Sequence, residues 1–87
     1  MDIGIKKPTD AEARDMAGEP IWEKEVSTFP WEYDMNETCL LLEGEVTVTP
    51  EGGAPVTFGA GDLVTFPKGL RCTWDVTRPV RKHYRFF

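Results

Sequence analysis

Short runs in which apolar and polar residues alternate fill most of the chain, and each run ends at glycine, proline or a charged turn. Runs rich in β-branched and aromatic residues are typical of strands. They predict seven strands, at residues 21–29, 38–42, 45–49, 56–58, 63–66, 72–76 and 80–87. Closely and regularly spaced strands of this kind predict an all-β sandwich or barrel.

One segment near the N-terminus has a helical pattern instead. Thr9 and Glu12 have the spacing of a capping box, the alanines and methionine that follow favour a helix, and Gly18 stops it. We therefore expect a short helix between Thr9 and Gly18 that precedes the strands.

Alternation assigns the side chains of residues 37–42 to two faces. Glu37, Cys39 and Leu41 share one face, and positions 38, 40 and 42 share the other, so both faces carry apolar residues. A strand that is apolar on two sides needs cover on two sides. The barrel interior would cover one face, and a partner subunit or the N-terminal segment would cover the other. We expect a homodimer that uses this outward face.

The same period places Cys72, Trp74 and Val76 on one face, which we expect to be the inner one. On the last strand, positions 80, 82, 84 and 86 read as a core face in which Lys82 snorkels toward water. That assignment would turn His83 outward, whereas an interior that tolerates polar residues would turn it inward, and the pattern leaves both open.

Length and charge limit the function classes. We expect the 87 residues, of which 40% are hydrophobic, to form one domain, 1–87. The net charge of −5 argues against nucleic acid, because phosphate binding needs a basic surface. The first residues lack the apolar core typical of a signal peptide, and no apolar run is long enough to span a membrane, so we expect a cytoplasmic protein without a membrane partner. Its two cysteines, Cys39 and Cys72, should then be free thiols.

Two motifs resemble those of the cupins. Gly61, Pro67 and Gly69 match the second cupin motif in register, and Cys72 stands in its histidine slot. Glu37 and Gly44 match the second half of the first motif, where Trp31 and Tyr33 occupy the two histidine slots. The segments around residues 20–26 and 79–85 are similar to the small cupins grouped with ureidoglycine aminohydrolase and ethanolamine-utilisation proteins.

The resemblance implies a double-stranded β-helix, that is, a jelly-roll β-barrel. It also implies that the usual metal site of three histidines and a glutamate is altered, because only Glu37 remains of the four ligands. Tryptophan cannot bind a metal through its indole N–H, and neutral tyrosine is a poor ligand. A zinc site built from Glu37, Cys72 and His83 is the alternative, since zinc accepts oxygen, sulfur and nitrogen ligands.

We therefore expect a pocket without metal or cofactor, which binds or modestly transforms a small polar metabolite. A non-enzymatic structural or ligand-sensing barrel is the other possibility, and the sequence does not decide whether the protein is an enzyme. Glu37 and Cys72 are the candidate catalytic residues. The candidate ligand-binding residues are Trp31, Tyr33, Cys39, Trp74 and His83.

Overall fold

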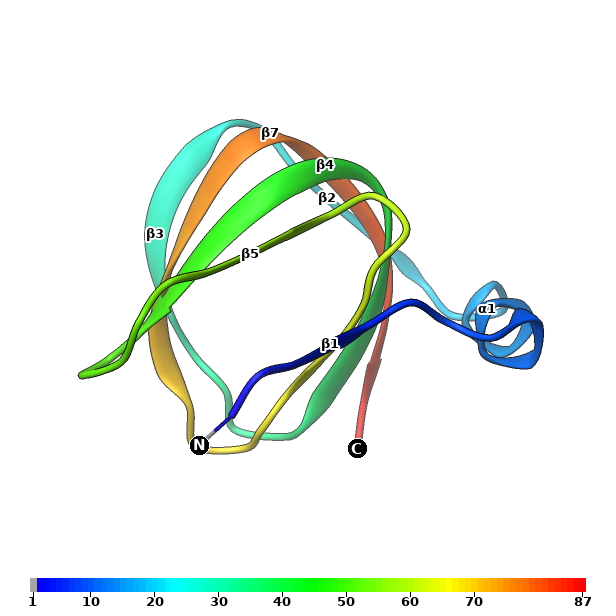
Figure 1. Cartoon of the computed structure of the whole chain (residues 1–87), viewed down its shortest axis with the longest axis horizontal. Helices are drawn as coiled ribbons and strands as arrows, with labels where there is room; N and C mark the ends of the chain where they lie inside the picture. Colours follow the sequence, from blue (N-terminus) through cyan, green and yellow to red (C-terminus); the bar gives the residue numbers. More distant parts are fainter. Residues whose placement is uncertain (1) are drawn as a thin grey trace.

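The computed structural model describes residues 2–87, which form a curled antiparallel sheet with a short helix on its outside (Figure 1). The all-β class with a short N-terminal helix is thus confirmed. The elements are β1 (Gly4–Lys6), α1 (Asp10–Met16), β2 (Ile21–Lys24), β3 (Ser27–Glu32), β4 (Glu37–Pro50), β5 (Val56–Gly59), β6 (Leu63–Phe66) and β7 (Arg71–Phe86).

Two long strands, β4 and β7, organise the sheet. They pair with each other from Glu37 and Phe86 at one end to Pro50 and Cys72 at the other. The first part of β4 also pairs with β6, which pairs with β1, and its second part pairs with β5. In the same way, β3 and β2 pair with successive parts of β7. Because each long strand has different neighbours along its length, the sheet curls around an interior (Figure 1).

Gly44 allows β4 to continue where the sequence predicted the end of one strand and the start of another. Its φ is 102°, and an added Cβ would lie 2.8 Å from the Cα of Val80 on β7. The register between β4 and β7 shifts around this point, between Leu41 and Val46. The glycine therefore marks a bulge that bends a continuous strand, not a turn.

The N-terminal segment packs on the outside of the barrel. The Thr9 hydroxyl accepts from the backbone N–H of Glu12 at 3.2 Å, and the Glu12 carboxylate accepts from the backbone N–H of Thr9 at 2.9 Å, so the predicted capping box is confirmed. Before the helix, β1 pairs with β6, and the sequence pattern did not predict this strand.

α1 covers part of the outer face of β4. Met16 packs against Leu40 and Leu63, and all three side chains are buried. Leu42, two residues beyond Leu40, remains 38% exposed. A partner subunit or the N-terminal segment was expected to cover this apolar face. The N-terminal segment covers the part around Leu40.

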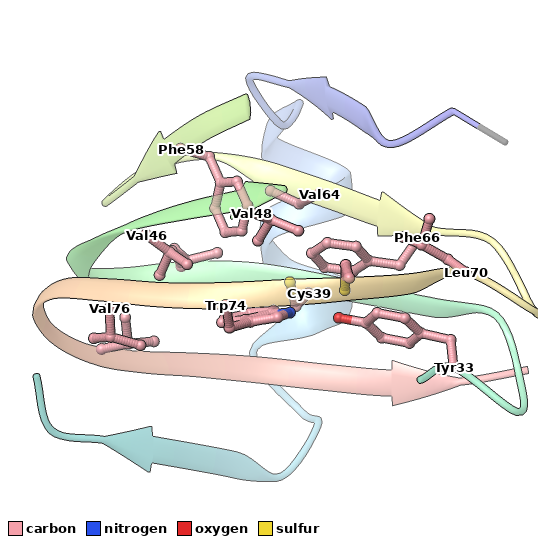
Figure 2. Close-up of a cluster of buried hydrophobic side chains, with 13 residues drawn as sticks. Tyr33, Cys39, Val46, Val48, Phe58, Val64, Phe66, Leu70, Trp74 and Val76 are labelled. Carbon is pink, nitrogen blue, oxygen red and sulfur yellow. The ribbon is translucent and has the colours of Figure 1, made fainter. Parts of the chain in front are cut away.

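The barrel interior is filled by apolar side chains from β4, β5, β6 and β7 (Figure 2). Cys72, Trp74 and Val76 are all buried, as alternation predicted. The Trp74 ring lies 5.8 Å from the Phe58 ring and 5.7 Å from the Phe66 ring, measured between centroids. One side of Trp74 thus packs against the core.

Candidate functional site

A cavity of about 190 Å³ lies inside the barrel beside Trp74. Its walls come from β2, β3, β7, the start of β4 and the connection before it. The lining residues are Trp22, Phe29, Trp31, Tyr33, Glu37, Trp74, Lys82, Tyr84 and Phe86. Seven of these nine side chains are aromatic, so the cavity has flat walls, and only Glu37 and Lys82 carry charge.

Glu37 and Lys82 form an ion pair within this aromatic surface. The Lys82 Nζ lies 3.2 Å from Glu37 Oε2 and 3.4 Å from Oε1, and each side chain is only 5% exposed. Charged groups are rarely buried unless they are paired, because the loss of hydration is costly. The pair therefore explains how two charged side chains are accommodated at the cavity wall.

Two indole rings surround the ammonium group on other sides. The Lys82 Nζ lies 4.9 Å from the centroid of Trp22 and 4.8 Å from that of Trp74. At such distances the negative ring faces attract a cation. Glu37 and the two rings together hold the lysine head group at one place on the cavity wall.

Sequence reasoning did not select Lys82 as a site residue. It placed Lys82 correctly on the inner face but expected the head group to reach water, whereas the whole residue is 4% exposed. The signal was present in the alternation, because an inward carboxylate at Glu37 needs a cationic partner and Lys82 is the basic residue on the inner face of the last strand.

Trp74 and Tyr33 bring two further polar atoms into the interior. The Trp74 indole nitrogen is buried and has no hydrogen-bond partner within residues 2–87. It points toward the Tyr33 hydroxyl (Figure 2). Burial raises the pKa of Tyr33 far above its ordinary value, and the Glu37 carboxylate raises it further, so the phenol is protonated. The Tyr33 hydroxyl therefore adds a donor to the cavity wall, and the Trp74 N–H faces that hydroxyl.

The two cysteines are buried, but neither lines this cavity. Cys39 is fully buried in the core, and burial raises its pKa to about 12. Cys72 is 7% exposed, and its thiol donates to the backbone oxygen of Trp31 at a distance of 3.6 Å. Burial also raises the pKa of Cys72. Because the nucleophilic form of cysteine is the thiolate, this environment does not activate Cys72.

His83 lies apart from the other candidates, on the outer face of β7. Its Nδ1 is 2.8 Å from the backbone oxygen of Glu19, in the connection after α1. The strand pattern left both an inward and an outward orientation of His83 open, and the structure shows the outward one. Alternation explains this, since Lys82 occupies the inner face next to it.

The zinc alternative built from Glu37, Cys72 and His83 is consequently wrong. Across the described part of the chain, no three His, Cys, Asp or Glu side chains come close enough together to hold a metal ion. In the positions that correspond to cupin ligands, Trp31 has no suitable atom, Tyr33 is protonated and Glu37 is paired with Lys82. The residues present do not fit the metal of the metal-dependent cupins.

The curled barrel with its internal cavity defines a small cupin. The family of EutQ-like cupin domains matches residues 11–84, and the chain belongs to this family. This confirms the resemblance that the two motifs suggested. No curated protein matches the chain significantly.

No helix in residues 2–87 has the length and apolar character needed to cross a membrane.

Solved structures agree with this assignment. A DUF861 family protein from Thermotoga maritima is 56% identical, with a TM-score of 0.95, and the match covers 99% of this chain and 100% of that one. A putative ethanolamine utilization protein Q from Salmonella typhimurium LT2 is 25% identical, with a TM-score of 0.69, over 98% of this chain and 68% of that chain. The EutQ protein of Clostridium difficile shares the fold, with a TM-score of 0.70 at 24% identity, over 77% of this chain and 52% of its own.

Proposed function

We propose that the barrel binds a small, flat, uncharged molecule that carries hydrogen-bond acceptors, without a metal ion. The observation that carries the proposal is the buried Glu37–Lys82 pair in the wall of an otherwise aromatic cavity. Aromatic walls with few, well-placed polar groups are the usual composition of a small-molecule site.

The size of the cavity limits the ligand. An apolar protein cavity of about 150 Å³ is known to hold benzene. The cavity of about 190 Å³ therefore suits a single ring with one small substituent. The seven aromatic side chains in the wall favour a flat ligand, because aromatic groups stack with an offset or meet edge to face.

The polar groups limit its chemistry. Lys82 has three N–H donors, and the two oxygens of Glu37 engage it at one side. The hydroxyl of Tyr33, which lines the cavity and stays protonated, is a further donor. The ion pair carries no net charge, so a charged ligand would lose its hydration without a free countercharge. A carbonyl oxygen or a ring nitrogen satisfies these donors at lower cost.

Both catalysis and simple binding are compatible with this site. A sensor or carrier needs only the cavity and its donors. A reaction would need a group that moves protons, and Glu37 with Lys82 is the pair placed to do so, whereas the protonated thiol of Cys72 is not.

We also propose a cytoplasmic location and a homodimer. The location is supported by Cys39 and Cys72, which are free thiols. The dimer is supported by apolar side chains on the surface, such as Val26, which is 60% exposed, and Leu42. A monomeric mass in light scattering at micromolar concentration would contradict the dimer.

The binding proposal is tested with three probes of one size and different charge: benzamide, benzoate and benzylammonium. We expect benzamide to bind most tightly in ligand-observed NMR. Tyr33→Phe keeps the ring but removes the O–H, and it should weaken benzamide roughly five-fold, which corresponds to one hydrogen bond. The matched control Trp22→Phe should change this affinity less. Absence of benzamide binding at millimolar concentration, or stronger binding of a charged probe, would overturn the proposal.

A further inference from the structure

Lys82 differs from the other lysines of the chain in its surroundings. The side chains of Lys6 and Lys7 are 56% and 75% exposed, and Lys68 also faces water. Lys24 lies over the ring of Phe29 at 5.3 Å but is only partly buried. Lys82 lines a cavity, is 5% exposed along its side chain, and has a carboxylate in contact with its nitrogen. A primary amine in an apolar cavity wall, beside a proton-accepting group, can act as a nucleophile toward carbonyl carbon.

From this geometry, and resting on the proposed binding function, we propose that Lys82 forms an imine with a small aldehyde bound in the cavity. Glu37 moves the protons. This assigns a carbonyl compound as the ligand class and Lys82 as the group that bonds to it.

The reaction balances with the two side chains alone. Glu37 accepts a proton from the Lys82 ammonium, and the neutral amine attacks the carbonyl carbon, whose oxygen takes up the second proton of the nitrogen to give a carbinolamine. The carboxylic acid of Glu37 then protonates the hydroxyl group, the C–O bond breaks, and water leaves. A protonated imine and the Glu37 carboxylate remain, so the sum is ammonium plus aldehyde giving iminium plus water.

The surroundings of Lys82 suit both the first proton transfer and the cation that the reaction forms. The 3.2 Å contact places a proton acceptor directly against the nitrogen that must lose a proton before it can attack. The iminium product is again a cation at the same nitrogen. It therefore retains the Glu37 carboxylate and the faces of Trp22 and Trp74, at 4.9 and 4.8 Å in the free protein, as stabilising neighbours.

The test uses benzaldehyde and sodium cyanoborohydride, a hydride donor that reduces an imine to a stable secondary amine. Intact-mass and peptide analysis of the wild-type protein should find one benzyl group on Lys82, introduced at least about ten times faster than on Lys24, because a positioned acid–base group accelerates such steps. Lys82→Met should abolish the fast labelling, whereas Lys24→Met should leave it unchanged. Glu37→Gln, checked for folding by near-ultraviolet circular dichroism, should slow it by about 100-fold.

Benzamide has nearly the shape of benzaldehyde but does not form an imine, so it separates the two proposals. It should compete with the labelling of Lys82. If Lys82 is labelled no faster than Lys24 while benzamide still binds, the imine proposal falls and the binding function stands. If neither compound binds, both fall. The wild-type comparison of Lys82 with Lys24 decides the question even if a variant does not fold.

Discussion

The carboxylate of Glu37 and the ammonium of Lys82 meet inside the barrel although 45 positions separate them in the sequence. Removal of either partner leaves a buried charge without its counterion. We expect Glu37→Gln and Lys82→Met each to lower the free energy of unfolding by about 3–5 kcal/mol. The double variant should cost clearly less than the sum of the two, because it buries no charge. Urea unfolding followed by tryptophan fluorescence measures these differences.

An exposed pair provides the matched control for this cycle. Arg81 and Glu23 lie 3.6 Å apart, with side chains that are 48% and 69% exposed. Pairs at the surface contribute no more than about 1 kcal/mol. Glu23→Gln should therefore change stability little. Additive effects of the Glu37 and Lys82 substitutions would mean that the two charges do not depend on each other.

The strand pattern predicted the fold well because inner and outer residues alternate along the strands, except at the bulge in β4. Alternation placed Cys72, Trp74 and Val76 on the inside, and all three are buried. It failed at Gly44, since a glycine with positive φ can end a strand or bend one, and only the contact with Val80 on β7 decides between them. β1 was missed because its pairing with β6 is a long-range contact with a weak local signal.

The site was harder to predict than the fold. Motif register brought Trp31, Tyr33 and Glu37 into consideration, alternation added Trp74, and all four line the cavity. It also selected Cys72, which lies inside but bonds to the Trp31 backbone. Lys82 falls outside both motifs. Its role depends on how far its side chain reaches along the interior, which the period of a strand does not specify.

Gly44 offers a test of the bulge in β4. Gly44→Ala would place a methyl group against the backbone of β7, 2.8 Å from the Cα of Val80, at a φ of 102° that other residues rarely adopt. The substitution should cost several kcal/mol, more than about 3 kcal/mol if the strands must separate. Gly52→Ala is the control, because Gly52 also has positive φ but no atom within 4 Å of an added Cβ. Similar unfolding midpoints for both variants would argue against close contact at the bulge.

Asp62 should make stability depend on acid pH. Its carboxylate accepts from Lys7 Nζ at 2.8 Å and from the backbone N–H of Gly59 at 2.9 Å, and these bonds hold its pKa below the usual value, the lysine contributing most. The folded protein therefore binds fewer protons here than the unfolded chain. The stabilisation is complete above the unfolded pKa, near 3.9, and is lost as the pH falls through the lower pKa of the folded state.

Asp62→Asn should accordingly lower stability at pH 7 by about 1 kcal/mol and by less at pH 2 to 3, where the wild-type carboxyl becomes protonated. Lys7→Met should reduce the same pH dependence, because it removes the largest cause of the shift. Chemical unfolding at a series of pH values measures both effects. Wild-type and Asp62→Asn curves that stay parallel from pH 7 to pH 2 would contradict this role of Asp62.

The donor atoms around the cavity predict that metal does not stabilise this cupin. Zinc, iron, nickel and manganese need several nitrogen, sulfur or oxygen ligands around one point. Here Glu37 is engaged by Lys82, and Tyr33 is kept protonated by burial. Protein purified without added metal should contain far less than one equivalent of these ions, and EDTA should leave its Tm unchanged. A Tm measured with excess zinc is the control, because it detects zinc binding that occurs only at a high zinc concentration. Stoichiometric metal in the purified protein, lost in Glu37→Gln, would show instead that Glu37 releases Lys82 to bind an ion.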